Sequence, residues 1–321
     1  MKPSILLTTQ WPLDVTKALE IDYHVIKPND GEDFSMDEIV AHSSSVDAIC
    51  PAFYNPFDAT LIEQLSKRVK LLASFGVGTN HIDVKAAVVK GLLVSNTPDV
   101  LTNATADIAI GLMISTYRRF YDREMALRNK QWPGASLTQH LAHDISGKTL
   151  GIIGMGRIGQ AVAKRAGAFD MPVKYWSRHR KPEIEADLNL TFCDNMEELI
   201  ASVDCLSLHT ALTDDTHHLI NTKRLKMMKK DSVLINTGRG PLVDEAALCN
   251  SLESGHLWGA GLDVYEFEPK VNERLMALKN VTLLPHIGSA THETRSAMGF
   301  RVKENLDRYF AGQPLLDFVS E

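Results

Sequence analysis

One segment limits the fold of this chain more than any other. A β-branched run at residues 149–153 leads directly into Gly154, Gly156 and Gly159, and a stretch of helical period follows. In a strand–turn–helix unit of this kind the first glycine permits the tight turn, the second lets backbone approach a pyrophosphate, and the third lets helix and strand pack closely. The amides at the start of the helix face the phosphate charge. Although such glycines can also serve a turn alone, the flanking strand and helix predict a Rossmann dinucleotide-binding unit, whose expected cofactor contacts are Gly154, Met155, Gly156, Arg157, Ile158 and Gly159.

The end of the next predicted strand bears on which dinucleotide is bound. An acidic residue usually stands there and accepts hydrogen bonds from the adenosine ribose. This chain instead has Ser177, followed by Arg178 and Arg180. A guanidinium matches phosphate geometry, and no carboxylate is present to repel a 2′-phosphate. The segment therefore predicts NADP(H) as the preferred cofactor, with NAD(H) as a second option; the alternative interpretation is a solvated basic turn.

Short β-branched runs alternate with segments of helical period along nearly the whole chain. This pattern is typical of parallel sheets built from βα units. Residues 102–129 interrupt the alternation and contain no proline, so we expect one long helix that could bridge two domains. The helical tail at residues 291–311 follows the last strand and is expected to return to the first domain. Strands are expected at residues 4–8, 23–26, 47–50, 70–74 and 92–95, then at 149–153, 173–176, 204–208, 232–236, 258–262 and 281–284.

Charge and hydropathy exclude several classes of partner. The 321 residues include 34 Lys and Arg against 40 Asp and Glu, a formal net charge of −6, so no overall positive field attracts nucleic acid or anionic lipid. No apolar run approaches the roughly 18 residues that a membrane helix needs, and the N-terminus has no signal-peptide core. We expect a cytoplasmic protein that binds neither nucleic acid nor membranes. No metal site is expected, because no zinc-ligand spacing joins His81, His217, His218 and His292.

Six motifs, in order along the chain, resemble the D-2-hydroxyacid dehydrogenase family. They are the glycine loop and residues 76–83, 96–107, 235–240, 260–269 and 285–291. The resemblance implies an α/β fold of two doubly wound parallel-sheet domains. One is a Rossmann dinucleotide-binding domain, expected at residues 99–288. The other is flavodoxin-like and completed by the C-terminal helix; it is the substrate-binding, catalytic domain, expected at residues 1–98 and 289–321.

Three residues are the expected catalytic group: Arg239, Glu268 and His286. Arg239 follows a strand end, and its fork of donors suits a carboxylate and an adjacent ketone oxygen. A carboxylate beside a histidine favours the imidazolium and fixes one tautomer, which makes His286 an acid for a nascent alkoxide. The resemblance assigns the carboxylate to Glu268, directly before a proline, and we expect the competing Glu266 to be exposed. An arginine that caps a turn and a packed histidine are the structural alternatives.

Further contacts follow from the same motifs. Val77 and Gly78 come after a predicted strand, and such a turn presents backbone N–H groups that can hold a substrate carboxylate. Asp263 resembles the family residue that binds the nicotinamide carboxamide. The remaining expected cofactor contacts are Thr105, Thr210, Thr237, Gly238, Arg239, His286 and Gly288.

Within the family the motifs look most like bacterial glyoxylate/hydroxypyruvate reductases, also called 2-ketogluconate reductases. The resemblance implies reduction of small anionic 2-keto acids to D-2-hydroxy acids, and a homodimer formed through the cofactor domain with residues 121–143 as the exchanged arm. Glu268 argues against formate dehydrogenases, which carry glutamine there. The alternatives are a short phosphoglycerate dehydrogenase and, in a different class, a corepressor of this fold that binds NAD(H) and acts by recruiting proteins.

Overall fold

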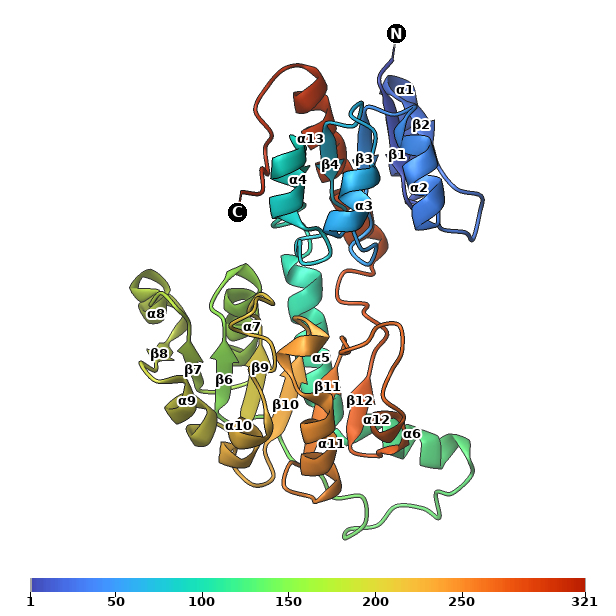
Figure 1. Cartoon of the computed structure of the whole chain (residues 1–321). Coiled ribbons are helices and arrows are strands. Elements are labelled where there is room, and N and C mark those ends of the chain that lie inside the picture. Colours follow the sequence, from blue (N-terminus) through green and yellow to red (C-terminus); the bar gives the residue numbers. More distant parts are fainter. Residues whose placement is uncertain (1, 321) are drawn as a thin grey trace. The chain divides into compact units, whose positions relative to one another are not determined.

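The computed structural model describes residues 2–320 and divides the chain into two compact units (Figure 1). The first unit runs to Leu101 and resumes at Ala290, whereas the second is Thr102–Ser289. Each unit is built on one parallel sheet, as expected for the α/β class. None of the helices in the described part of the chain combines the length and hydropathy that a membrane span requires.

The first unit contains a five-stranded sheet of order β2-β1-β3-β4-β5, the flavodoxin-like order. Its central strands are buried on both faces, which explains their continuous apolar runs. Helices α1 and α13 cover one face and α2, α3 and α4 the other. The strands are β1 (Ser4–Leu7), β2 (His24–Ile26), β3 (Ala48–Cys50), β4 (Leu71–Ala73) and β5 (Leu93–Ser95), and the helices are α1 (Leu13–Asp22), α2 (Met36–Ser43), α3 (Ala59–Gln64), α4 (Val84–Lys90) and α13 (His292–Phe310).

The C-terminal helix α13 belongs to this first unit. Thr291 caps its start by accepting a hydrogen bond from the N–H of Thr294. Gly299 lets α13 approach α1 closely, because a Cβ at that position would lie 2.6 Å from Val15. The tail thus returns to the first sheet, as its late position in the chain predicts.

The second unit contains a seven-stranded parallel sheet of order β12-β11-β10-β9-β6-β7-β8. Read from β8, this is the Rossmann order with one strand added at the far edge. Helices α5 and α7 cover one face, and α9, α10 and α11 cover the other. The strands are β6 (Leu150–Ile153), β7 (Val173–Trp176), β8 (Leu190–Phe192), β9 (Cys205–Leu208), β10 (Val233–Asn236), β11 (Gly259–Leu262) and β12 (Val281–Leu283). The helices are α5 (Thr102–Arg118), α6 (Phe120–Arg128), α7 (Arg157–Gly167), α8 (Pro182–Leu188), α9 (Met196–Ser202), α10 (Thr222–Met227), α11 (Glu245–Glu253) and α12 (Glu273–Ala277), with a 3₁₀ turn at Gly240–Leu242.

The prediction of one helix over residues 102–129 is wrong. Arg119 takes a left-handed φ of 53° and separates α5 from α6. Its guanidinium donates to the carbonyl of Trp258 at 3.0 Å and lies 4.1 Å from the centre of that indole ring. Helix α5 packs on the sheet of the second unit, whereas α6 buries none of its residues. Tertiary contacts of Arg119 therefore end a helix that local sequence would continue.

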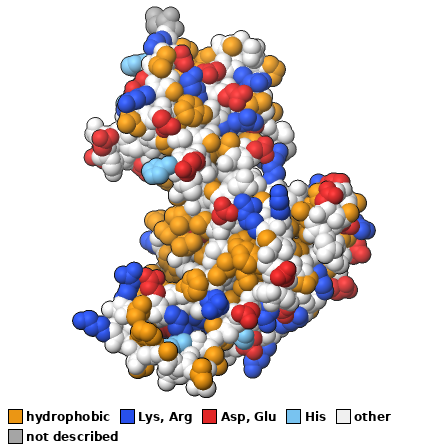
Figure 2. Space-filling model, turned by 180° about the vertical axis from the view of Figure 1, so that it is seen from behind, with side chains coloured by type: hydrophobic (Ala, Val, Ile, Leu, Met, Phe, Trp, Pro, Cys, Tyr) orange, Lys and Arg blue, Asp and Glu red, His pale blue; other side chains and the backbone are white. Residues whose placement is uncertain are grey.

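Surface charge agrees with the balanced composition. On the face drawn in Figure 2, Lys and Arg side chains alternate with Asp and Glu, and neither sign forms an extended field. Residues 121–143 expose several large apolar side chains, including Trp132 at 56% and Leu137 at 96%. Exposed apolar side chains, where they form a contiguous patch, are typical of surfaces that bind another protein.

Candidate active site

Most of the predicted site residues follow strands of the seven-stranded sheet. The glycine loop follows β6, Thr210 follows β9, residues 237–240 follow β10, residues 263–268 follow β11, and residues 286–288 follow β12. Because the carboxyl ends of parallel strands meet at one edge of a sheet, these loops lie where open α/β sheets bind ligands. Thr105 reaches the same edge from α5.

The glycine loop has the geometry that its sequence predicts. Gly154 takes a φ of 97°, and a Cβ there would lie 2.6 Å from the carbonyl oxygen of His209. A Cβ on Gly159 would lie 2.2 Å from the Gly154 carbonyl oxygen, whereas one on Gly156 would meet nothing within 4 Å. No side chain caps the start of α7. The loop therefore packs tightly on its inner side and keeps an open outer side next to helix N–H groups.

Other residues of the glycine loop differ in exposure. Met155 is 2% exposed and packs into the core, so only its backbone can face a ligand. Arg157 is exposed at the start of α7, and Ile158 packs partly against the same core. Among these three side chains, those of Arg157 and Ile158 have surface to offer a ligand, and their contact with a cofactor stays a prediction.

Behind this loop lies a histidine that titrates far from its usual range. The Nε2 atom of His209 is 2.8 Å from the hydroxyl of Ser207, and burial lowers the pKa of His209 to about 4. An unfolded histidine titrates near pH 6.5. The folded state therefore excludes a proton that the unfolded state accepts between these values, so this histidine contributes stability above about pH 6.5 that is lost as the pH falls through 4.

A stability measurement tests this consequence. Between pH 7 and pH 4 the parent protein is expected to lose about 3 kcal/mol of unfolding free energy through His209, because one pKa unit corresponds to about 1.4 kcal/mol. His209→Gln should lose correspondingly less over the same range in urea denaturation. His24→Gln, at an exposed site in β2, is the matched control. Equal pH slopes for the parent and His209→Gln would contradict the assignment.

The loop that carries Arg239 is held by a buried asparagine. The side chain of Asn236 donates to the Arg239 carbonyl at 2.9 Å and accepts from the N–H of Gly238 at 3.0 Å. Gly240 is required, because a Cβ there would lie 1.8 Å from the Tyr265 carbonyl oxygen. Sequence reasoning missed Asn236, although an asparagine that bonds backbone two residues on is a recognised turn signal. The loop is thus fixed in shape on both sides of Arg239.

Arg239 itself is mostly withdrawn from water. Its Nη1 donates to the Gly238 carbonyl at 2.8 Å. Burial lowers the pKa of its guanidinium and the Glu268 carboxylate opposes that shift, but an arginine keeps its charge in either case. Nearby, the hydroxyl of Thr237 is buried and has no hydrogen-bond partner among the described residues. The loop after β10 thus presents a desolvated cation and an unsatisfied hydroxyl.

Glu268 and His286 form the pair that the motifs predict. Glu268 Oε2 lies 2.7 Å from Nδ1 of His286, and Oε1 accepts from the N–H of Tyr265 at 2.9 Å. Burial raises the pKa of the Glu268 carboxyl, but the bond to His286, its charge, the Tyr265 N–H and Arg239 together hold that pKa below its usual value. Glu268 therefore stays a carboxylate at neutral pH. Its contact with Nδ1 fixes the orientation of the imidazole ring, in which Nε2 is the nitrogen that does not contact Glu268.

His286 sits in a backbone conformation that needs support. Its φ is 54°, which is uncommon for a residue other than glycine. The next two N–H groups, of Ile287 and Gly288, each donate to one carboxylate oxygen of Asp263 at 2.7 Å. Thr105 donates to the Gly288 carbonyl at 3.1 Å. Asp263 and Thr105 thus hold the turn that presents the histidine.

This role for Asp263 is additional to the one expected. Burial raises the pKa of its carboxyl, while the two backbone N–H groups and His286 act to lower that pKa. Both carboxylate oxygens already accept hydrogen bonds within the protein. Contact with a nicotinamide carboxamide stays a prediction, whereas support of the His286 turn is a property of the fold.

The expectation that Glu266 is exposed is wrong. Its side chain is 13% exposed and its Oε1 lies 2.7 Å from Nε2 of His218. Its backbone N–H donates to Glu245, a buried carboxyl at the start of α11. Glu266 is covered because it pairs with residues that are distant along the chain, and sequence spacing does not reveal such contacts.

The basic segment after β7 divides into two kinds of residue. Arg180 forms a bidentate pair with Glu185, through Nε at 2.8 Å and Nη2 at 2.7 Å. This pair, with the Tyr175 hydroxyl, lowers the pKa of Glu185 to about 2. Arg178 is exposed, and the hydroxyl of Ser177 donates to the His179 carbonyl at 2.6 Å. Arg180 therefore shapes this loop, and its contact with a cofactor stays a prediction.

In the first unit, Val77 and Gly78 follow β4. The Val77 carbonyl accepts a hydrogen bond from the side chain of Asn96 at 2.8 Å. Gly76 lies close to Phe53, since a Cβ there would be 2.9 Å from that side chain. The turn is therefore anchored, and its role in substrate binding stays a prediction.

Comparison with known proteins gives one family. The model of the D-isomer specific 2-hydroxyacid dehydrogenase NAD-binding domain matches residues 110–288. Over 317 residues the chain is 42% identical to a glyoxylate reductase of Thermococcus litoralis, covering 98% of this chain and 95% of that protein. The crystal structure of a glyoxylate reductase from Paecilomyes thermophila is similar at a TM-score of 0.89, with 38% identity and 99% and 98% of the two chains covered. The crystal structure of an NADPH-dependent glyoxylate/hydroxypyruvate reductase from Sinorhizobium meliloti, in complex with NADP and malonate, gives 0.87 at 34% identity, with 100% and 97% covered.

Proposed function

Because this chain belongs to the D-isomer specific 2-hydroxyacid dehydrogenase family, we propose that it reduces small 2-keto acids, glyoxylate and hydroxypyruvate first among them, to D-2-hydroxy acids. The substrates of the similar enzymes support this assignment, and 2-ketogluconate is a further candidate. The observation that carries the proposal is the 2.7 Å bond between Glu268 and His286, with the charge of the partly buried Arg239 acting on the same carboxylate.

The three residues have different tasks in this reaction. Arg239 binds the substrate carboxylate and polarises the adjacent keto oxygen. His286 gives a proton to that oxygen as the carbonyl carbon is reduced. Glu268 holds the imidazole through Nδ1 and stabilises its charged form, and Nε2 is the nitrogen that gives the proton to the substrate. A nicotinamide cofactor, when bound, supplies the hydride that reduces the carbonyl carbon.

Three observations fit a bound dinucleotide. The outer side of Gly156 is open, the N-terminus of α7 has no side-chain cap, and the Thr237 hydroxyl is buried without a partner among residues 2–320. The pyrophosphate would meet Gly156 and the first N–H groups of α7. We assign this cofactor-binding role to residues 99–288. Residues 1–98 and 289–321 then form the substrate-binding domain, with Val77 and Gly78 as contacts for the carboxylate.

We further propose that NADP(H) is preferred over NAD(H). No carboxylate stands at Ser177 to accept from the ribose hydroxyls, and the exposed Arg178 is available to a 2′-phosphate. The NADPH dependence of the similar Sinorhizobium meliloti enzyme supports the proposal. Arg180, bound to Glu185, positions this loop.

The preference is expected to be tenfold or more in kcat/KM. One charge-assisted contact contributes about 1.5 to 3 kcal/mol, and each 1.4 kcal/mol is a factor of ten. Arg178→Ala should raise KM for NADPH and leave KM for NADH nearly unchanged, whereas Ser177→Asp should move the preference toward NADH. Steady-state kinetics with both cofactors measure this. A parent enzyme that uses NADH as well as NADPH, or better, would contradict the proposal.

A homodimer is the proposed assembly. The exposed apolar side chains of residues 121–143, with Trp132 and Leu137 foremost, support this segment as the arm exchanged between two copies. We expect the dimer to form through the cofactor domain.

A substrate panel tests the proposed function. NADPH oxidation should be measured with glyoxylate, hydroxypyruvate, 2-ketogluconate and the phosphorylated keto acid that a short phosphoglycerate dehydrogenase would use. Turnover that is fastest with glyoxylate or hydroxypyruvate is expected. Cofactor binding without turnover of any keto acid would instead favour the corepressor alternative.

A further inference from the structure

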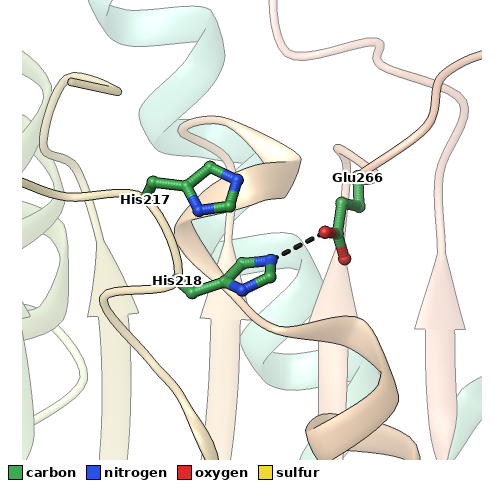
Figure 3. A group of neighbouring side chains, drawn as sticks. All are labelled: His217, His218 and Glu266. Carbon is green, nitrogen blue, oxygen red and sulfur yellow. Dashed lines mark hydrogen bonds and ion pairs between the residues drawn. The ribbon is translucent and has the colours of Figure 1, made fainter. Parts of the chain in front are cut away.

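Two histidines and a glutamate of the second unit lie together outside the catalytic pair (Figure 3). His217 and His218 belong to the turn between β9 and α10, and Glu266 follows β11. Nε2 of His218 is 2.7 Å from Oε1 of Glu266, and the two imidazole rings stack with their centres 4.1 Å apart. One ligand atom from each residue lies within 4.8 Å of the other two. Figure 3 shows both rings extending toward the glutamate.

The backbone explains why neighbouring residues point the same way. In an extended strand, successive side chains point to opposite faces. His218 instead takes a left-handed φ of 49°, and its N–H donates to the Pro241 carbonyl at 2.7 Å. On the other side, the N–H of Glu266 donates to the buried Glu245 at 2.6 Å. Both parts of the cluster are therefore fixed by backbone bonds to neighbouring segments.

The donor set is one that zinc uses. Two imidazole nitrogens and a carboxylate oxygen form the three-ligand group of open zinc sites, in which water takes the fourth position. With metal–ligand bonds of about 2.0 to 2.2 Å and tetrahedral angles, the ligand atoms would stand roughly 3.4 Å apart. On metal binding the 2.7 Å distance between His218 Nε2 and Glu266 Oε1 would lengthen slightly, and the distances from the His217 nitrogen to the other two ligand atoms would shorten. Rotation of the exposed His217 ring allows this change.

The surrounding charge favours a cation. Glu245 and Glu268 flank Glu266 in this part of the fold. The N–H of Glu266 donates to the Glu245 carboxyl at 2.6 Å, and the N–H of Glu245 lies 3.4 Å from Oε2 of Glu266. A divalent cation beside Glu266 would relieve the repulsion among these carboxylates.

We propose that His217, His218 and Glu266 bind a divalent transition metal ion of the zinc class, with its remaining position open to water. Sequence spacing does not predict this site, since Glu266 is 48 residues from His218 along the chain. The site is separate from the catalytic His286 and does not depend on the reaction proposed above. It also accounts for a buried Glu266 that the reductase chemistry does not use.

Cobalt and zinc titrations test the site in the full chain without an affinity tag. Isothermal titration with Zn²⁺ should give one equivalent per chain. Co²⁺ should give the visible absorption of a four-coordinate nitrogen and oxygen site, without the sulfur charge-transfer band that binding at the partly exposed Cys193 would add. Binding should weaken as the pH falls, because ligand histidines must be neutral.

Variants decide between a metal site and a structural ion pair. His217→Gln removes a ligand at an exposed position and leaves the His218–Glu266 bond in place. It should weaken Zn²⁺ binding by more than the roughly 10- to 100-fold that loss of an outer-shell partner costs. His24→Gln, at an exposed histidine of the first unit, should bind as the parent does. Equal affinity in the parent and His217→Gln, or no binding in the parent, would overturn the proposal while leaving the proposed reductase activity untouched.

Discussion

His286→Ala is expected to lower kcat for glyoxylate reduction by roughly 10² to 10⁴-fold, the range that positioned proton transfer contributes. The Nδ1 atom of His286 is held 2.7 Å from Glu268, and we assign protonation of the alkoxide to the other ring nitrogen. His286 is only one of the expected cofactor contacts and the others are unchanged, so NADPH affinity should change little. Stopped-flow kinetics and NADPH fluorescence titration measure the two effects separately.

Glu268→Gln separates the charge of this carboxylate from its shape. Since the pKa of Glu268 is held below its usual value, the parent carries a negative charge beside His286 throughout the neutral range. Glutamine keeps the size and removes the charge that favours the imidazolium. The alkaline limb of the pH–rate profile for reduction should therefore move to lower pH. An unchanged profile, together with full activity of His286→Ala, would remove both residues from the mechanism.

Arg239→Lys is expected to reduce kcat/KM by about 10² to 10³-fold, because it removes a donor aimed at the developing oxyanion. Lysine keeps the charge but loses the planar fork that grips a carboxylate and a keto oxygen together. KM should rise and kcat should fall, since the same group binds the substrate and stabilises the transition state.

The control for this variant is Arg274→Lys. Arg274 forms a bidentate pair with Glu253 at an exposed position, so the same substitution should leave turnover intact. Parent-like kinetics in Arg239→Lys would show that Arg239 only shapes its loop.

The fold was predictable where strands are apolar runs and where a glycine motif fixes the turn that follows. Buried parallel strands such as β6 and β10 are continuous apolar runs, and the glycines after β6 leave few choices of local geometry. Strand β8 was not predicted, because its three residues include only one buried side chain. The break at Arg119 was also missed, since its cause is the distant Trp258.

The site shows the same limit. The resemblance to the family implied the pairing of Glu268 with His286, and the structure confirms that these side chains meet. Sequence reasoning did not find the residues that support the catalytic group. Asn236 bonds to the backbone of Arg239, and Asp263 accepts from the N–H that follows His286. The burial of Glu266 beside His218 was unpredictable for the same reason, because local patterns carry no information on which distant loops share a sheet edge.

Reduction of hydroxypyruvate with product analysis tests the central claim most directly. The purified protein, supplied with NADPH, should consume hydroxypyruvate and NADPH in equal amounts and release D-glycerate, and His286→Ala should lose this activity. Formation of the L product, or NADPH binding without turnover of hydroxypyruvate or glyoxylate, would contradict the account.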